Sequence, residues 1–341
     1  MGPRILIVNV NWFGDALFST PALRALRKHF PDSFLACAVP ARCAAVLKNN
    51  PYLNEVIVVE DKIPFYAWIG HLRVILEFKK RRFDTAIFFH RSKTKVLWAL
   101  MAGIRERAGY EGPGGRTRLL TRACPVPVKT LHKTDYFLHL LEFLGVPADG
   151  RVPDFIPQEG AKVELDALRE SYGIPNGAPY AVMHAGGNWA LKRWPESYFI
   201  DWAKLLIRKY SWPIVICGTA SEEALSKRIC ASFAEGQVVS FCGKTSVDTL
   251  ALLLKDAQVF LSNDSGPIHL AASQGARTVG LFGPTSPDVT GPVSKGSLVV
   301  LRRDVGCEVP CYYRSCDYRV CMEWLKPEEV FQETVKLLNG N

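Results

Sequence analysis

SNDSGPIHLAA, residues 262–272, joins the end of a predicted strand to the start of a predicted helix. The apolar residues 259–261 are typical of a buried strand, and Pro267 suits the first position of a helix. Backbone N–H groups from Ser265 onward lack partners within such a helix, so they can bind a diphosphate. Because Asp264 repels a bare phosphate, we expect its carboxylate to accept hydrogen bonds from sugar hydroxyl groups. The stretch therefore predicts an α/β junction that binds a nucleotide sugar; an ordinary N-cap by Asp264 or Ser265 is the alternative.

Short apolar runs alternate with longer helical patterns along the rest of the chain. Predicted strands in the first half are residues 5–10, 34–39, 56–59 and 85–89, and a helix is expected between the first of these and residue 29. Predicted strands in the second half are residues 180–184, 214–217, 238–241, 259–262 and 278–282. Because a helical pattern separates each strand from the next, the repetition predicts parallel sheets covered by helices.

The length of 341 residues, 48% of them hydrophobic, suffices for two substantial cores. A stretch rich in proline and glycine, residues 145–179, separates the two halves and encloses a helical pattern at 161–172. We predict domains at residues 1–155 and 156–325, followed by a helix within 326–341 that packs back on the first domain. Each domain is expected to be a Rossmann-like, doubly wound parallel sheet, and the two sheets are expected to face a central cleft that holds the ligand.

The net charge of +9 predicts an acidic partner. Basic residues concentrate at 79–82 and in a glycine-rich loop, residues 109–122, without the interleaved aromatic residues of a nucleic-acid stacking platform. The pattern therefore favours a membrane surface or a phosphorylated substrate over nucleic acid. A charged face that only aids solubility is the alternative.

The N-terminal apolar run, residues 5–10, is too short for a signal peptide, and no apolar run approaches the roughly 18 residues of a membrane span. We therefore expect a cytoplasmic protein. Six cysteines lie within apolar stretches, as core residues do, and are expected to be free thiols: Cys37, Cys43, Cys124, Cys217, Cys230 and Cys242.

Gly14 and Asp15 follow the first predicted strand, which places Asp15 at the expected cleft. Partial shielding by Trp12 and Phe13 is expected to raise the pKa of Asp15 toward that of a base that takes a proton from an attacking hydroxyl. The alternative is that Asp15 caps the next helix. Neither a three-glycine dinucleotide fingerprint nor a phosphate-binding P-loop occurs, which disfavours dehydrogenases and P-loop NTPases.

In the second half, Lys192 and Arg193 follow a strand and precede a helix that begins near Pro195. A lysine fixed beside helix-end amides stabilises a departing nucleotide diphosphate more than the intact donor. An exposed loop lysine is the alternative. Glu222 follows the next strand, where it can bind ribose hydroxyls, and Thr285 can donate to a phosphate.

Taken together, these motifs resemble glycosyltransferase family 9, the ADP-heptose:lipopolysaccharide heptosyltransferases. The resemblance rests on Gly14-Asp15 with residues 20–24, on residues 192–195, on residues 264–272 and on residues 283–285. It implies a GT-B fold with the acceptor on the N-terminal domain and the nucleotide sugar on the C-terminal domain. It also implies inversion at the anomeric carbon without a metal and without a cofactor, with ADP-heptose as donor substrate.

The resemblance also assigns roles to single residues. Asp15 matches the proposed general base and Lys192 the phosphate-binding lysine, and these are the predicted catalytic residues. The predicted donor-binding residues are Glu222, Asp264, Ser265, Gly266, His269 and Thr285. Within this set, Asp264 matches the aspartate that holds the heptose, and Glu222 matches the ligand of the nucleotide ribose, with the adjacent Glu223 as the alternative.

The implied acceptor is the inner core of lipopolysaccharide, at the cytoplasmic face of the inner membrane, where the protein is expected to lie as a peripheral protein. Arg116, Arg118 and Arg122 are predicted to bind phosphate or carboxylate groups of this acceptor. Two alternatives remain: another nucleotide-sugar enzyme, with a different donor sugar or an epimerase activity, and a nucleotide-binding protein without turnover.

Four cysteines near the C-terminus form a local cluster: Cys307, Cys311, Cys316 and Cys321. Four thiolates can hold zinc, but the spacing here is looser than the paired C-x-x-C of zinc ribbons. We favour reduced structural cysteines over a zinc site, and predict no metal site.

Overall fold

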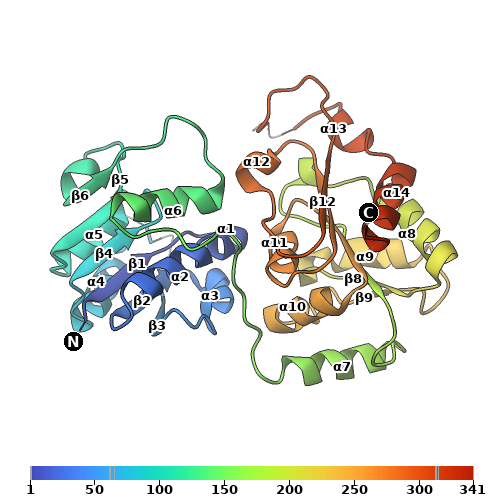
Figure 1. The fold of residues 1–341 in the computed structure, drawn as a ribbon, viewed down its shortest axis with the longest axis horizontal. Helices are drawn as coiled ribbons and strands as arrows, with labels where there is room; N and C mark the ends of the chain where they lie inside the picture. Colours follow the sequence, from blue (N-terminus) through green and yellow to red (C-terminus); the bar gives the residue numbers. More distant parts are fainter. Residues whose placement is uncertain (1, 61–62, 65, 312, 314, 341) are drawn as a thin grey trace. The chain divides into compact units, whose positions relative to one another are not determined.

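The computed structural model describes residues 2–60, 63–64, 66–311, 313 and 315–340. The chain forms two compact units, Met1–Phe155 and Ile156–Asn341. Each unit is built around a six-stranded parallel sheet flanked by helices (Figure 1).

The first unit contains strands of four to six residues and one of three, joined mostly by helices. Its strands are β1 (Arg4–Val8), β2 (Phe34–Val39), β3 (Glu55–Val58), β4 (Thr85–Phe88), β5 (Glu106–Tyr110) and β6 (Arg122–Cys124). Its helices are α1 (Phe13–Phe18), α2 (Thr20–His29), α3 (Ala41–Leu47), α4 (Trp68–Lys80), α5 (Lys93–Met101), the short 3-10 helix η1 (Thr117–Leu119) and α6 (Lys133–Phe143). The strand order is β3-β2-β1-β4-β5-β6, so the sheet grows outward from β1 in both directions.

The second unit repeats this topology. Its strands are β7 (Ala181–His184), β8 (Ile214–Ile216), β9 (Val238–Ser240), β10 (Val259–Asn263), β11 (Thr278–Phe282) and β12 (Leu298–Arg302). Its helices are α7 (Ala161–Ser171), η2 (Ala190–Lys192), α8 (Glu196–Tyr210), η3 (Ala220–Glu222), α9 (Glu223–Cys230), α10 (Val247–Asp256), α11 (Gly266–Ser273), α12 (Pro287–Thr290), α13 (Val320–Glu323) and α14 (Pro327–Leu338). The order β12-β11-β10-β7-β8-β9 grows outward from β7 in the same way.

This topology determines where ligands bind. In the first unit β1 pairs in parallel with β4, and in the second unit β7 pairs in parallel with β10, with Ser262 opposite His184. In each pair, the connection that follows one strand runs to one side of the sheet and the connection that follows the other strand runs to the opposite side, which opens a crevice at the carboxyl ends of the two strands. The segments after β1 and β4, and those after β7 and β10, are therefore the expected ligand-binding segments of their units.

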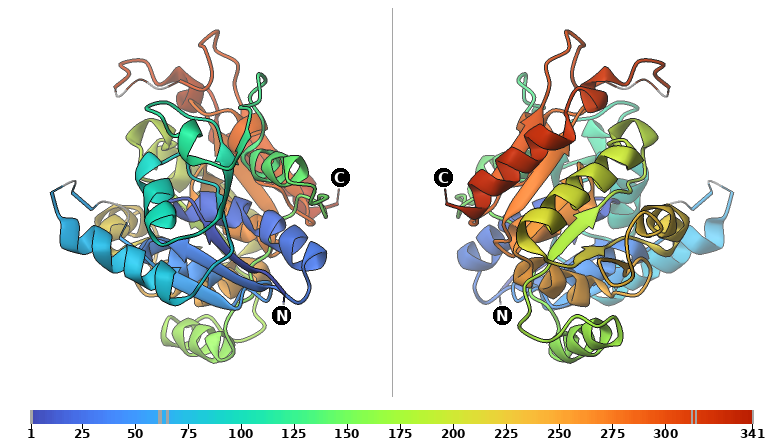
Figure 2. Two further views of the ribbon diagram at one scale, coloured as in Figure 1. Left: turned by 90° about the vertical axis from the view of Figure 1, so that its left-hand side faces the viewer. Right: turned by 90° about the vertical axis from the view of Figure 1, so that its right-hand side faces the viewer.

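The C-terminal helix is part of the second unit, where α14 lies beside α8 (Figure 2). Packing of the segment 326–341 on the first domain stays a prediction. Its buried residues Val330 and Leu337 join the core of that unit, and Trp202 Nε1 on α8 donates to Thr334 Oγ1 at 3.1 Å. The amphipathic face of α14 is buried against its own unit, where α8 supplies the matching apolar surface.

Two other differences concern local structure. The helix expected up to residue 29 is divided into α1 and α2 at Ser19, whose hydroxyl donates to Ala16 O and accepts from buried Asn9. The basic segment 109–122 is not a loop throughout, because β5 ends at Tyr110 and β6 begins at Arg122. Across the described residues, every helix falls short of the length and apolar character that a membrane span requires.

Candidate functional site

The turn after β7 is closed by Glu222 from the end of η3. Glu222 Oε1 accepts from Gly187 N at 2.7 Å and lies 3.3 Å from His184 Nε2. Its Oε2 accepts from Thr219 N at 2.8 Å and from Thr219 Oγ1 at 3.0 Å. A Cβ atom on Gly186 would lie 1.7 Å from Glu222 Oε1, so only glycine permits this approach.

These contacts determine the charge of Glu222. Burial would raise its pKa, but the hydrogen bond from His184 and the positive charge that this ring carries when it is protonated, together with the N–H groups of Thr219 and Gly187, lower the pKa to about 2. The neighbouring Glu223 instead pairs with Lys227 at 2.8 Å on the exposed side of α9. Of the two adjacent glutamates, only Glu222 is placed at the glycine turn.

Asn263, the last residue of β10, holds the same turn from the other side. Its Nδ2 donates to Ala185 O and to Gly186 O, both at 3.0 Å, and its Oδ1 accepts from Trp194 N at 3.0 Å. The side chain is completely buried, so these bonds replace water. No motif in the sequence points to this role of Asn263; its position at the end of a buried strand was the available signal.

Lys192 and Asp264 meet at the carboxyl ends of β7 and β10. Lys192 Nζ lies 2.7 Å from Asp264 Oδ2, and Thr285 Oγ1, after β11, donates to the same oxygen at 2.6 Å. His269 Nε2 on α11 lies 4.0 Å from Asp264 Oδ1. The structure thus brings together four residues that the sequence placed in three separate motifs.

Ser265 precedes α11 as its N-cap residue, and Gly266 is the first residue of the helix. The Ser265 hydroxyl makes no capping bond to the described residues of the helix; its Oγ lies 2.9 Å from His184 Nδ1. The geometry therefore does not support the alternative in which the Ser265 side chain only caps the helix. His184 was not among the expected site residues, although it closes the strand that precedes the glycine turn.

This arrangement has two chemical capacities. The Lys192 ammonium and the amino end of α11 are donors suited to phosphate oxygens, whereas the Thr285 hydroxyl gives its one proton to Asp264. The carboxylates of Glu222 and Asp264 are acceptors suited to sugar hydroxyls. A ligand that carries both a diphosphate and sugars matches this combination.

In the first unit, Asp15 lies in the first turn of α1, directly after β1 and the segment 9–12. The N-cap position is occupied by Trp12, so Asp15 is within the helix rather than before it. Asp15 and Phe13 are half-buried, whereas Trp12 is 61% exposed and contributes little shielding. A carboxylate in a first helical turn is favoured in its ionised form by the helix dipole.

A buried lysine that the sequence analysis missed supports this segment. Lys95 on α5 is only 2% exposed, and its Nζ donates to Asn11 Oδ1 at 2.8 Å and to Asn9 O at 3.4 Å. It therefore fixes the segment that connects β1 to α1. In the sequence, KTKVLWALM is an ordinary helical pattern with no indication that this lysine points inward.

The three arginines expected to bind the acceptor occupy different environments. Arg116 is fully buried, and its guanidinium donates to Tyr110 O and, at 3.3 Å, to His90 O. Arg122 is exposed and donates to Phe143 O at the end of α6 at 3.3 Å, and Arg118 is exposed on η1. The burial of Arg116 gives it a structural task and does not support its acceptor role, because a buried guanidinium cannot reach a surface ligand. Acceptor contacts by Arg118 and Arg122 stay predictions.

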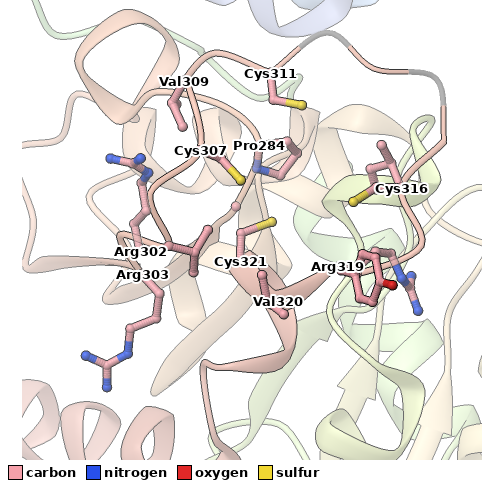
Figure 3. Close-up of a pocket in the computed structure, with 14 residues that line it drawn as sticks. Pro284, Arg302, Arg303, Cys307, Val309, Cys311, Cys316, Arg319, Val320 and Cys321 are labelled. Atoms are coloured by element: carbon pink, nitrogen blue, oxygen red, sulfur yellow. The ribbon is translucent and has the colours of Figure 1, made fainter.

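The clustered cysteines line one pocket together with residues 283–284 (Figure 3). Cys311 N donates to Pro284 O at 2.7 Å, and a Cβ atom on Gly283 would lie 3.2 Å from Cys321 Sγ. No disulfide forms in the part of the chain that the structure describes, and no three His, Cys, Asp or Glu side chains there are placed to hold a metal ion. The cysteine segment thus packs directly against the turn that carries Thr285.

Comparisons with known proteins agree with this geometry. Residues 71–319 match the model of glycosyltransferase family 9 (heptosyltransferase). The chain is 33% identical to lipopolysaccharide heptosyltransferase 1 of Pseudomonas aeruginosa over 93% of this chain and 88% of the relative. It is 27% identical to lipooligosaccharide heptosyltransferase 2 of Campylobacter jejuni over 99% of each chain.

The fold is similar to that of the solved E. coli ADP-heptose lps heptosyltransferase II, with a TM-score of 0.79, 24% identity and 99% of both chains covered. Two doubly wound parallel sheets in one chain confirm the GT-B fold that the sequence predicts. Because the family model spans residues 71–319, well over half of the chain, and the Pseudomonas relative is similar along nearly all of it, the protein belongs to glycosyltransferase family 9 and is a glycosyltransferase.

Proposed function

We propose that this protein transfers heptose from ADP-heptose to the inner core of lipopolysaccharide, with inversion at the anomeric carbon. The names of its relatives support the substrate class. The observation that carries the proposal is the pairing of Lys192 with buried Asp264 beside the start of α11, because it combines a phosphate donor with a sugar-hydroxyl acceptor at one place.

The second unit binds the donor. Lys192 has three N–H bonds, so it can keep Asp264 as a partner and still donate to a phosphate oxygen. The negative charge on ADP grows as the glycosidic bond breaks, and a fixed ammonium therefore stabilises the transition state more than the bound donor. Asp264 holds heptose hydroxyls, and Glu222 binds the ribose of the nucleotide in exchange for its contact with the Thr219 hydroxyl.

The first unit binds the acceptor, and Asp15 is the general base. Its ionised carboxylate takes the proton of the attacking hydroxyl as that oxygen bonds to the anomeric carbon and ADP departs from the opposite side. Lys95 fixes the segment before α1 and so contributes to the position of Asp15. Lys192 supplies the positive charge that the leaving group needs, which is consistent with transfer that does not depend on a metal.

We further propose that the protein works at the cytoplasmic face of the inner membrane as a peripheral protein. The net charge of +9 supports this placement, because both lipopolysaccharide precursors and the membrane surface are anionic. Exposed Arg118 and Arg122 are the residues proposed to contact acidic groups of the acceptor.

A competition experiment tests this function. The protein is supplied with a truncated lipopolysaccharide core, ADP-heptose and several other nucleotide sugars, and the products are identified by mass spectrometry. We expect addition of one heptose to the acceptor and release of ADP. Addition of another sugar would contradict the donor assignment, an altered donor without acceptor would indicate an epimerase, and ADP binding without transfer would indicate a protein that only binds nucleotide.

A further inference from the structure

His184 lies between two residues of the donor site and contacts both. Its Nε2 is 3.3 Å from Glu222 Oε1, and its Nδ1 is 2.9 Å from Ser265 Oγ. The side chain is only 4% exposed, so bulk water does not replace either contact. Imidazole thereby links the residue proposed to bind ribose to the residue at the start of the phosphate-binding helix.

The chemistry of the partners determines where protons lie before a ligand arrives. Both oxygens of Glu222 accept from backbone N–H groups, which favours the ionised carboxylate, so His184 Nε2 carries the proton that faces Glu222 Oε1. In a neutral ring Nδ1 then has a lone pair, and the Ser265 hydroxyl donates to it. Ser265 Oγ also lies 3.2 Å from Asn263 O, but a hydroxyl has only one proton to give. Ser265 therefore has no proton left for a ligand.

A diphosphate at the start of α11 changes this balance because its oxygens only accept hydrogen bonds. When the Ser265 proton turns toward a phosphate oxygen, the lone pairs of Oγ and of His184 Nδ1 face one another at 2.9 Å. Protonation of Nδ1 removes this repulsion, since an imidazolium donates from both nitrogens. Glu222 then balances the positive charge at the other nitrogen.

We propose that His184 takes up a proton when the donor diphosphate binds, and that this proton turns the Ser265 hydroxyl toward phosphate. The inference rests on the proposed function, which places the diphosphate beside Ser265. His184 acts through Ser265 and Glu222 and is a positioning residue. Because binding is coupled to proton uptake, donor affinity falls as the pH rises.

Other titratable groups lie on the elements around β7. Cys217 follows β8, and burial raises its pKa well above the ordinary value, so it stays neutral. On the β10 side, Asp264 is paired with Lys192, and His269 lies near Asp264 Oδ1. Glu222 is the carboxylate that contacts the His184 ring, and His269 is the competing histidine that the experiment must separate.

The test is calorimetric titration of the whole protein with ADP at mildly alkaline pH, where the phosphates of ADP are fully ionised. Repeating it in buffers of different ionisation enthalpy gives the number of protons taken up. We expect uptake of up to about one proton per ADP in the unchanged protein. Ser265→Ala, which leaves no hydroxyl to reorient, and His184→Gln, which keeps a donor for Glu222, should both abolish uptake and weaken ADP binding by about ten-fold or more.

Two further variants serve as controls. His29→Gln, at an exposed histidine on α2 of the first unit, should leave uptake and affinity unchanged. His269→Gln should retain uptake. Intact ADP binding without uptake, or uptake that survives Ser265→Ala or disappears in His269→Gln, would overturn the role of His184 while leaving the donor site in place. Failure of ADP to bind would overturn both this inference and the proposed function.

Discussion

Lys192 Nζ lies 2.7 Å from Asp264 Oδ2, so that one ion pair connects the segment after β7 to the segment after β10. The Asp264 side chain is only 3% exposed, while Lys192 is 24% exposed. A buried carboxylate needs a partner, whereas the lysine can still turn a proton toward solvent or ligand. The pair therefore places the Lys192 ammonium group at the crevice that the topology of the second sheet creates.

Removing this cation should affect the transition state more than the bound donor. Lys192→Ala is expected to lower kcat by about 10²–10³-fold, by analogy with the loss of one fixed donor to a developing oxyanion. Steady-state kinetics of heptose transfer measure this effect. Lys227→Ala, at an exposed lysine paired with Glu223, is the matched control and should leave kcat unchanged. An unchanged kcat in Lys192→Ala would show that Lys192 does not stabilise the leaving group.

The adjacent glutamates provide a second comparison. Glu222→Gln should raise the KM for ADP-heptose by about ten-fold or more, because it removes a charged hydrogen-bond acceptor from the proposed ribose site. Glu223→Gln should leave that KM unchanged, since Glu223 is exposed and contacts Lys227. Equal effects of the two substitutions on the KM for ADP-heptose would contradict the assignment of Glu222, and not Glu223, as the ribose ligand.

Glu222 also predicts a dependence of stability on pH. Its pKa is lowered from 4.5 to about 2, so the folded state favours the ionised form. The stability contributed by this group is present above the ordinary pKa and is lost as the pH falls from about 4.5 toward about 2. Denaturant unfolding across this range should show a steeper acid loss in the unchanged protein than in Glu222→Gln. Identical slopes would mean that Glu222 is not held in its charged form.

Asn263 is expected to be important for the shape of the donor site. Asn263→Ala leaves two backbone carbonyl groups and one N–H group without their partner, at a cost of about 1–3 kcal/mol for each group that stays unsatisfied. The free energy of unfolding should fall and the KM for ADP-heptose should rise together. Asn188→Ala, at an exposed position in the same turn, is the control. A stable Asn263→Ala variant with normal KM would show that the turn needs no such support.

Two arginines in the basic segment of the first unit are expected to have different roles, one structural and one in acceptor binding. Arg118→Ala should raise the acceptor KM and leave the melting temperature unchanged, because Arg118 is exposed. Arg116→Ala should lower the melting temperature, because the buried guanidinium holds Tyr110 O and His90 O. Thermal unfolding and acceptor titrations on both variants check this pair. An unchanged acceptor KM in Arg118→Ala would show that the acceptor does not bind at η1.

Most of the fold follows from the sequence because apolar strands and amphipathic helices alternate. The predicted strand 278–282 agrees with β11 at both ends, and the predicted strand 259–262 is one residue shorter than β10. β12 was missed although Leu298–Leu301 is a continuous apolar run, and β5 and β6 were missed because their sequences, Glu106–Tyr110 and Arg122–Cys124, are interrupted by charged residues. Such strands are stabilised mainly by a neighbouring strand, which local sequence does not reveal.

The site was predictable only in part. Charged residues that follow strands, such as Lys192 and Asp264, carry a recognisable signal. His184 and Asn263 stand at strand ends, but their contacts depend on parallel pairing of β7 with β10, which brings together residues about 80 positions apart and is not visible in the sequence. The inward direction of Lys95 and Arg116 is likewise a property of packing and is not visible in the pattern of neighbouring residues.

The central claim is that Asp15 activates the acceptor while the second unit holds the departing ADP. The most direct test is Asp15→Asn, which keeps the size of the side chain and removes the base. Heptose transfer measured by mass spectrometry should fall by about 10²–10⁴-fold, while the ADP affinity measured by calorimetry stays the same. Transfer at an undiminished rate in Asp15→Asn would contradict the account.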